Sequence, residues 1–312
     1  MPVKILPDAA AATRLADSIG NTPLVELPRF SAGAARIFAK LEWFNPGGSV
    51  KDRIARAMIT DAEKRGLLSA GGTIVEPTSG NTGVALAMLA AARGYRCIVV
   101  MPEGYGEVKA RLMAALGADV VRTPEGELMR GAIERAQQIA RETKGAYLPN
   151  QFSNPVNPQA HFETTGPEIA AAAPEPVDAF VAGVGTTGTF TGTARYLSTR
   201  YASIWRAAVE PQGSILGGGA HGPHAVEGIG LSFFPEILDR GVIDEVLTIG
   251  DEEAFETCRT VARTEGLLIA GSSGAAAAGA LRVARRLGPG RVVVTIFPDS
   301  TERYPHQGIF QK

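Results

Sequence analysis

The sequence is poor in cysteine: its 312 residues include only two, Cys97 and Cys258, which lie far apart in the chain. Neither cysteine has metal-ligand spacing, and two such residues do not make a disulfide framework. Cys97 lies in the apolar run Cys-Ile-Val-Val-Met at 97–101, which predicts a buried thiol and not a reactive one. This cysteine usage fits a reducing cytoplasm and predicts no metal site.

The sequence also lacks an excess of either charge, an apolar leader and long hydrophobic runs. There are 31 Lys and Arg against 32 Asp and Glu, a formal net charge of -1. Electrostatics therefore favours neither nucleic acid nor an anionic membrane as a partner. No uninterrupted apolar run approaches about 20 residues, and the first residues lack the apolar core of a signal peptide. We expect a soluble cytoplasmic protein with no nucleic-acid or membrane partner.

Glycine, in contrast, is abundant, with 37 residues, many of them just after apolar runs. Apolar strand-like runs alternate with alanine-rich helical stretches, which predicts mostly parallel sheets covered on both faces. The expected strands are 36–41, 73–76, 97–101, 119–122, 179–182, 206–210 and 291–297, and the expected helices include 84–93, 109–116, 129–143 and 252–265. We predict an α/β fold of two three-layer αβα domains, the smaller at 40–146 and the larger formed by 1–39 and 147–312.

Two stretches predict irregular structure. Residues 149–158 are rich in Asn, Pro and Ser and are typical of a loop between the two halves. Residues 212–231 are rich in glycine, contain two histidines and show no clear period. We predict that this second stretch is a long mobile loop that could close over a site.

Residues 45–53, Asn-Pro-Gly-Gly-Ser-Val-Lys-Asp-Arg, connect the strand at 36–41 to a helical pattern. Pro-Gly-Gly indicates a turn, and Ser49 with Asp52 three residues later predicts a variant of the capping box. Lys51 then falls in the first helical turn, where the helix dipole and any desolvation would lower its pKa. A neutral amine suits Schiff-base chemistry with a carbonyl, although an exposed surface lysine remains the alternative.

Two loops at strand ends contain small polar residues. Residues 78–83, Thr-Ser-Gly-Asn-Thr-Gly, precede a helix and offer N–H groups and hydroxyls to a carboxylate or a phosphate. A plain helix cap is the equally weighted alternative. Residues 297–300, Phe-Pro-Asp-Ser, follow the last strand and are by themselves typical of a simple turn.

A third loop, Gly-Val-Gly-Thr-Thr-Gly-Thr at 183–189, matches the dinucleotide pattern G-x-G-x-x-G. Glu210 ends the next strand, where the acidic residue of that fingerprint is expected. The same loop with its threonine hydroxyls would equally bind the single phosphate of pyridoxal phosphate. An NAD-dependent oxidoreductase is therefore a rival interpretation, resting on Gly183, Gly185, Gly188 and Glu210.

Four motifs in this order resemble the cysteine synthase/cystathionine β-synthase family of fold-type II pyridoxal phosphate enzymes. They are residues 46–53, 78–83, 183–189 and 298–304, and segments 19–25, 151–158 and 164–168 resemble the same family. The resemblance covers residues from about 18 to 304. It implies a fold like that of the tryptophan synthase β subunit, with pyridoxal 5'-phosphate in the cleft between the domains.

The resemblance implies a role for each matching residue. Lys51 would hold the cofactor covalently and later act as acid and base at the substrate Cα. Asn81 would contact the phenolic oxygen of the ring and Ser300 the pyridine nitrogen, with Asp299 as the competitor of Ser300. Thr187 stands where many relatives have glycine. The implied phosphate loop is Gly185, Thr186, Thr187, Gly188 and Thr189, and the implied clamp for the substrate carboxylate is Thr78, Ser79, Thr82 and Gln151.

Segments 210–216, 226–230 and 298–300 resemble the short bacterial type that combines O-acetylserine with homocysteine. The resemblance implies a homodimer that replaces the β-substituent of O-acetyl-L-serine, or L-serine, with a thiol. The product would be L-cystathionine from homocysteine, or L-cysteine from sulfide if the chain is a cysteine synthase proper. A non-catalytic binding module on the same fold is a further alternative. After Tyr304 relatives usually continue Leu-Ser, whereas this sequence continues Pro-His-Gln at 305–307.

Overall fold

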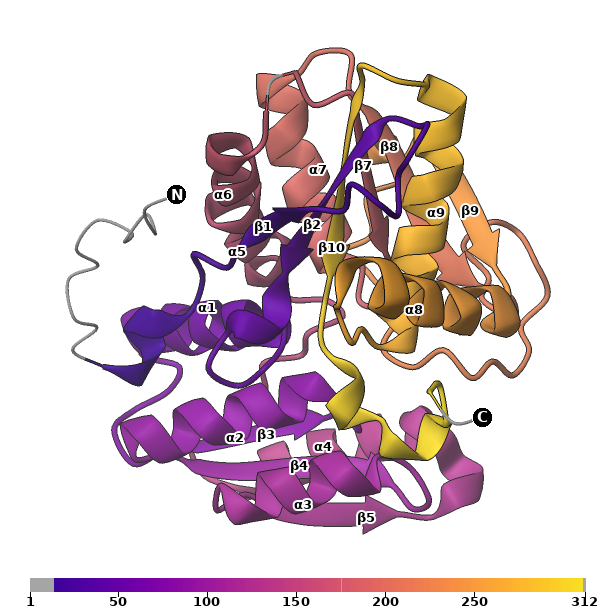
Figure 1. The fold of residues 1–312 in the computed structure, drawn as a ribbon. Helices are drawn as coiled ribbons and strands as arrows, with labels where there is room; N and C mark the ends of the chain where they lie inside the picture. Colours follow the sequence, from indigo (N-terminus) through magenta and orange to yellow (C-terminus); the bar gives the residue numbers. More distant parts are fainter. Residues whose placement is uncertain (1–13, 175, 311–312) are drawn as a thin grey trace.

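The computed structural model describes residues 14–174 and 176–310. Two α/β units lie one above the other in Figure 1, each a sheet with helices packed on its faces. Among the described strands, the larger sheet has the order β1-β2-β10-β7-β8-β9 and the smaller sheet the order β5-β4-β3-β6. The expected α/β fold with mostly parallel sheets is confirmed.

The larger sheet is parallel apart from β1, which pairs antiparallel with β2 at the edge. One face packs against α8 and α9, and the other packs against α6 and α7, with α5 beside them. The strands are β1 (Leu24–Glu26), β2 (Arg36–Leu41), β7 (Ala179–Gly183), β8 (Trp205–Pro211), β9 (Glu245–Ile249) and β10 (Val292–Phe297). The helices are α5 (Val156–Glu163), α6 (Thr165–Ala172), α7 (Gly188–Arg200), α8 (Asp251–Glu265) and α9 (Gly271–Leu287).

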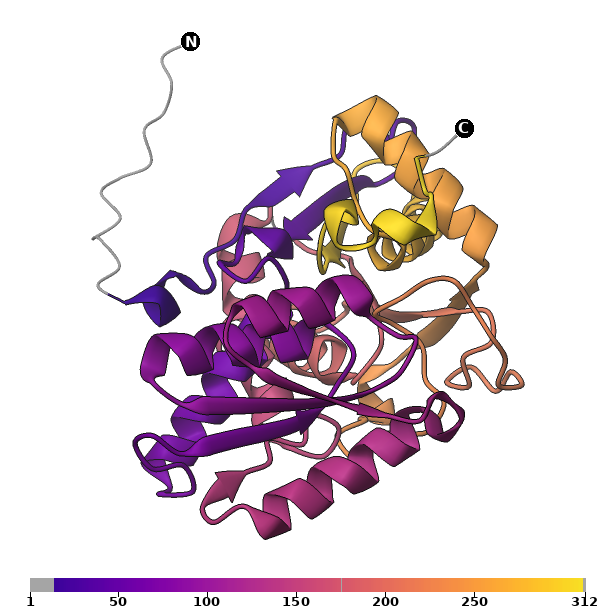
Figure 2. The ribbon, with the colours of Figure 1, turned by 90° about the horizontal axis from the view of Figure 1, so that it is seen from below.

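The smaller sheet is parallel throughout the described strands. Figure 2, seen from below, shows α4 on one side of this sheet and α2 and α3 on the other, in agreement with two separate apolar clusters. Its strands are β3 (Thr73–Pro77), β4 (Arg96–Pro102), β5 (Asp119–Thr123) and β6 (Ala146–Tyr147). Its helices are α2 (Asn81–Arg93), α3 (Glu107–Ala115) and α4 (Leu128–Glu142).

Helix α1 (Lys51–Lys64) joins the two units. Ala55 and Ile59 pack into the apolar cluster of the smaller unit, whereas Ile54 and Met58 pack against Ala160 of α5. Helix α1 therefore packs against both units, and Lys51, its first residue, lies where the two units meet. Short 3₁₀ turns occur at Leu15–Ser18, Glu42–Phe44, Glu125–Glu127, Arg240–Val242, Thr301–Arg303 and Pro305–Gln307.

Some elements differ from the expected ones. Helix α5 begins at Val156, within the stretch 149–158 that was expected to be a loop. Strands β1, β6 and β9 were not expected; they have two to five residues each, and all three lie at sheet edges. Residues 212–231 contain neither helix nor strand, as expected, but Leu216, Val226 and Leu231 are buried and anchor the segment.

We propose the same two-domain division, with limits that follow the sheets. Strand β2 pairs with β10 in the larger sheet as far as Leu41, so the smaller domain begins after residue 41. Strand β6 pairs with β3, so the smaller domain continues to Tyr147.

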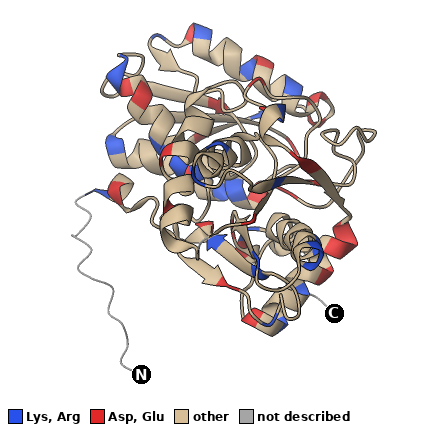
Figure 3. Cartoon of the chain, turned by 90° about the horizontal axis from the view of Figure 1, so that it is seen from above, with Lys and Arg blue, Asp and Glu red and all other residues tan. Residues whose placement is uncertain are grey.

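Charged residues of both signs are interspersed over the view in Figure 3 and do not separate into a basic and an acidic face. In the described part of the chain, no helix has the length and apolar character needed to cross a bilayer.

Candidate active site

The turn before α1 positions Lys51, although not through the expected capping box. Ser49 Oγ accepts a hydrogen bond from the N–H of Lys51 at 3.3 Å, whereas the Asp52 carboxylate accepts one from the N–H of Gly47 at 2.5 Å. Asp52 therefore closes the preceding Pro-Gly-Gly turn and does not cap the helix. Burial raises the pKa of Asp52 to about 7, although the Gly47 hydrogen bond opposes this effect.

Lys51 lies at a small cavity between α1, the end of β7 and the end of β10. Burial lowers the pKa of Lys51 below its ordinary value, while the negative charges of Asp299 and Glu42 act in the opposite direction. The other lining residues are Val50, Ala182, Gly183, Gly185, Thr186, Thr187, Thr189, Phe190, Gly228, Ile229, Ile296 and Pro298. The cavity thus brings Lys51 together with four of the five residues of the expected phosphate loop.

The loop before α7 is shaped for an anion. It ends at the N-terminus of a 13-residue helix, where free N–H groups and the helix dipole favour negative charge. Thr187 has φ +71°, a strained conformation for a β-branched residue, and its Oγ1 is buried without a partner among the described residues. A Cβ on Gly185 would lie 2.8 Å from the carbonyl oxygen of Gly228, so only glycine fits this part of the wall.

Gly188 does not line this cavity within the described residues, but it makes a different close contact. A Cβ at Gly188 would lie 1.9 Å from Asn157 Oδ1. Asn157 in turn donates to the carbonyl of Gln151 at 2.8 Å and to Thr186 Oγ1 at 3.2 Å. Gly188 therefore allows α7 to approach the residue that orients the loop.

His161 supports the same loop from behind. Its two ring nitrogens lie 2.9 Å from Thr165 Oγ1 and 3.1 Å from Thr189 Oγ1. Burial, reinforced by the positive charges of Arg53 and Lys51, holds the pKa of His161 well below its ordinary value. A neutral imidazole thus fixes the hydroxyl of Thr189, a contact that the sequence did not indicate.

The expected carboxylate clamp is partly assembled. Thr82 Oγ1 donates to Gln151 Oε1 at 2.7 Å, and Thr78 Oγ1 accepts from the N–H of Gly80 at 3.1 Å. Gln151 is positioned by Glu76, whose carboxylate accepts its N–H at 3.1 Å. Together with Ser79, these residues surround the N-terminus of α2, although in the described structure they do not line the cavity at Lys51.

Asn81 and the segment after β10 form one polar cluster. Asn81 Nδ2 donates to Asp299 Oδ2 at 2.6 Å, and the Tyr304 hydroxyl donates to the same oxygen at 2.5 Å. Arg303 donates to Asn81 Oδ1 at 2.9 Å and to the carbonyl of Gly47. Burial raises the pKa of Asp299, an effect that the hydrogen bonds from Tyr304 and Asn81 oppose.

Two serines are near this cluster, and they differ in environment. Ser300, the residue expected at the pyridine nitrogen, donates to Glu302 Oε2 at 2.6 Å and is not among the described lining residues. Ser272, at the start of α9, is 1% exposed, and its Oγ would lie 3.8 Å from a Cβ on Gly228, which does line the cavity. Sequence reasoning missed Ser272. The run Gly-Ser-Ser-Gly at 271–274, just before an alanine-rich stretch, was the available signal.

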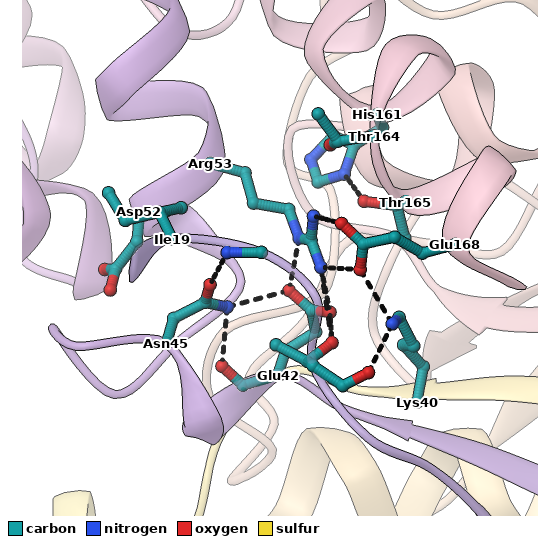
Figure 4. Close-up of polar contacts among 12 residues, drawn as sticks. Ile19, Lys40, Glu42, Asn45, Asp52, Arg53, His161, Thr164, Thr165 and Glu168 are labelled. Carbon is teal, nitrogen blue, oxygen red and sulfur yellow. Dashed lines mark hydrogen bonds and ion pairs between the residues drawn. The ribbon is translucent and has the colours of Figure 1, made fainter. Parts of the chain in front are cut away.

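A buried charge network holds the first turn of α1 in place (Figure 4). The Arg53 guanidinium, in a residue only 1% exposed, pairs with Glu42 at 2.7 Å and with Glu168 at 2.7 Å. Lys40 Nζ lies 2.7 Å from Glu168 as well. Burial alone would raise the pKa of Glu168, but Arg53 and Lys40 lower it to about 2. The network ties α1 to β2 and α6, and it therefore holds in place the helix on which Lys51 lies.

The dinucleotide interpretation fails on Glu210. Its carboxylate accepts the N–H groups of Leu216 and Gly217, both at 2.9 Å, and Glu210 is only 1% exposed. It is therefore not free to bind ribose hydroxyls.

The cysteines are both buried, as expected for Cys97, and burial raises the pKa of each thiol to about 12.

The family follows from sequence comparison. A family model described as "Pyridoxal-phosphate dependent enzyme" matches residues 15–299. The chain therefore belongs to the pyridoxal-phosphate dependent enzymes.

Within this family, its relatives include cysteine synthases and a cystathionine β-synthase, as the motifs indicated. It is 49% identical over 294 residues to a "Probable cysteine synthase" of Bacillus subtilis (strain 168). The alignment covers 93% of this chain and 94% of the relative. A solved O-acetylserine-dependent cystathionine β-synthase from Helicobacter pylori is 46% identical with a TM-score of 0.90, covering 96% and 99% of the two chains. A solved O-ureido-L-serine synthase is 40% identical with a TM-score of 0.92, covering 96% of each chain.

The residues present fit the cofactor of this family. Lys51 provides an amine of lowered pKa inside the cavity. The unpartnered Thr187 hydroxyl and the helix N-terminus at α7 provide donors for a phosphate. The cofactor and the class of enzyme expected from the sequence are therefore confirmed.

Proposed function

We propose that this enzyme catalyses β-replacement on O-acetyl-L-serine by a thiol, with homocysteine as the acceptor and L-cystathionine as the product. L-Serine is the alternative donor. The observation that carries the proposal is the shared cavity of Lys51 and the loop at the N-terminus of α7. The relatives named as cysteine synthase and O-acetylserine-dependent cystathionine β-synthase support this chemistry.

Lys51 is the residue that moves the proton. When bound, pyridoxal phosphate supplies an electron-accepting ring that acidifies the Cα–H of the amino acid. Lys51 Nζ, whose pKa is lowered by burial, takes this proton as a free amine and later returns it to Cα. The buried Arg53 network fixes the helix from which Lys51 acts, so the amine keeps one position during both transfers.

The loop residues bind and orient. Gly185, Thr186, Thr187 and Thr189 line the phosphate end of the cavity, with Gly188 allowing the close packing of α7. We propose that Thr78, Ser79, Thr82 and Gln151 bind the substrate carboxylate at the N-terminus of α2, with Glu76 fixing Gln151. Asn81 would exchange its bond with Asp299 for one to the phenolic oxygen of the ring.

For the pyridine nitrogen, Ser272 competes with Ser300. A hydroxyl at this position leaves the ring nitrogen largely unprotonated, which favours β-elimination over transamination. Ser272 is the buried serine beside the cavity wall, whereas Ser300 is paired with Glu302. If Ser272 makes the contact, Ser272→Ala shifts the absorbance of the bound cofactor and Ser300→Ala leaves it unchanged. The opposite pair of results would assign the role to Ser300.

Steady-state kinetics test the substrates directly. Homocysteine and sulfide are compared as acceptors, each with O-acetylserine and with serine as the donor. We expect the highest kcat/KM for O-acetylserine with homocysteine, and no turnover by Lys51→Ala. A preference for sulfide by orders of magnitude would replace the cystathionine assignment with cysteine synthase, the second candidate, which the 49% identical relative favours.

We also propose that the enzyme acts as a homodimer in the cytoplasm. The two buried free cysteines fit a reducing compartment, and the dimer rests on the family resemblance. Light scattering during size-exclusion chromatography tests the dimer, and a mass of one chain would contradict it.

A further inference from the structure

The segment that follows β10 crosses from the larger unit to the smaller one. In Figure 1 it is the yellow chain that descends from β10 toward α2, and Figure 2 shows it near the same part of the smaller unit. Arg303 donates to Asn81 at the start of α2, and the Tyr304 ring lies under Lys109 of α3. The segment continues with Pro-His-Gln at 305–307.

Lys109 is placed unusually for a lysine. It lies in the first turn of α3, where the helix dipole disfavours a cation, and its side chain is only 3% exposed. Its Nζ lies 3.3 Å from Glu227 Oε2 and 3.9 Å from the centroid of the Tyr304 ring. A buried ammonium needs such compensation, and both compensating groups come from outside the smaller unit.

Glu227 receives a second set of contacts from the C-terminal segment. His306 Nε2 lies 2.5 Å from Glu227 Oε1, and Gln307 Nε2 donates to Glu227 Oε1 at 3.3 Å and to the carbonyl of Ala225 at 2.9 Å. Glu227 thus uses one oxygen for the smaller unit and the other for the C-terminal segment.

These contacts reach the cavity through the neighbours of Glu227. Gly228 and Ile229 line the cavity, and the carbonyl of Gly228 packs against Gly185 of the phosphate loop. A Cβ on Gly228 would also lie 3.6 Å from the Tyr304 hydroxyl. The backbone at Glu227 is therefore continuous with the cavity wall.

We propose that Glu227, held between Lys109 of α3 and His306 of the C-terminal segment, is a latch that fastens the smaller unit over the cofactor cavity. With the latch closed, α3, the wall at 225–229 and the segment at 303–307 behave as one body. Opening it frees the mouth of the cavity for substrate and product. Lys109, Glu227 and His306 are positioning residues in this arrangement, because none of them lines the cavity among the described residues.

Hydrogen exchange on the cofactor-loaded enzyme tests the latch independently of any substrate. His306→Ala is the main variant, because its side chain is 55% exposed and its removal does not threaten folding. We expect exchange to become roughly two- to five-fold faster at 303–307, at 225–229 and also in α3 of the smaller unit. Lys109→Met should accelerate the same three segments, and the double variant should add little to either single one.

The matched control is Arg195→Met, which removes an exposed ion pair with Asp239 far from this cluster and should leave exchange in α3 unchanged. Faster exchange confined to 303–310 in His306→Ala would overturn the latch, as would fully additive effects of Lys109→Met and His306→Ala.

A kinetic measurement rests on the proposed function: His306→Ala should raise KM for O-acetylserine several-fold with kcat within two-fold of wild type. If the wild-type enzyme does not use O-acetylserine at all, the proposed function fails while the exchange result still decides the latch.

Discussion

Removing Arg53 should be the most destabilising single change near the site. Its guanidinium donates twice to Glu42, at 2.7 and 2.9 Å, and twice to Glu168, each at 2.7 Å (Figure 4). In Arg53→Met, Glu168 keeps Lys40, but Glu42, 0% exposed, keeps only the neutral donors Thr22 and Asn45. Lys40 and Lys51 still act on Glu42 through space, so the loss of its hydrogen-bonded cation should cost about 3 kcal/mol of unfolding free energy, the lower end for breaking a buried ion pair.

The assay is urea unfolding at pH 7.5 in the presence of the cofactor, followed by tryptophan fluorescence. Trp43, next to Glu42 in the sequence, makes the signal sensitive to this region. Arg195→Met, which breaks an exposed pair with Asp239, is the control and should change stability by no more than about 1 kcal/mol.

The double variant Arg53→Met/Glu42→Gln separates lost attraction from stranded charge. Glu42→Gln removes the charge that Arg53→Met leaves behind, so the double variant should be more stable than Arg53→Met alone. The reasoning is refuted if Arg53→Met costs less than about 1 kcal/mol. It is refuted equally if the two changes simply add, because the stranded Glu42 would then not be the cause.

Three further changes probe the loop and one buried acid. Thr187→Gly should relieve the strain at φ +71° and stabilise the cofactor-free protein by about 1 kcal/mol in urea unfolding, while absorbance titration shows weaker cofactor binding. Gly185→Ala should weaken cofactor binding roughly ten-fold in the same titration, because its Cβ would collide with the Gly228 carbonyl. Burial raises the pKa of Glu76 to about 7, so the stability that Glu76 contributes is full below pH 4.5 and is lost as the pH rises through 7. Between pH 5 and 8 the urea midpoint should therefore change less with pH in Glu76→Gln than in the wild type.

The elements predicted correctly are those whose own sequence shows the hydrophobic pattern of a strand or a helix. Strands β4, β7 and β10 are mostly apolar runs buried on both faces, and such runs can be recognised as strands from the sequence alone. Strand β9 is an edge strand of mixed burial with Glu245 at its start, and β6 has two residues defined only by their pairing with β3. Helix α5 begins directly after Pro155 in an Asn- and Pro-rich stretch, so its sequence favoured a loop.

The site divides in the same way. Lys51 and the loop before α7 follow strand ends, where parallel folds gather ligands, so local sequence made them candidates and the family resemblance then implied their roles. Gly228 and Ile229 reach the cavity from an irregular segment with no period, so only the folded chain reveals them. The capping box was wrong because the Asp52 carboxylate has a nearer donor in Gly47, a choice made by the geometry of the turn.

The pKa of Lys51 is set by two opposing effects, and Asp299→Asn separates them. Burial lowers this pKa, and the carboxylate of Asp299 is the first of the charges that raise it. Asparagine keeps an oxygen that can accept from Asn81 and Tyr304 but removes the negative charge. The pH midpoint for acylation of Lys51 in the cofactor-free protein should therefore fall below that of the wild type. An unchanged midpoint would show that Asp299 does not influence the pKa of Lys51, and a raised midpoint would contradict the electrostatic account.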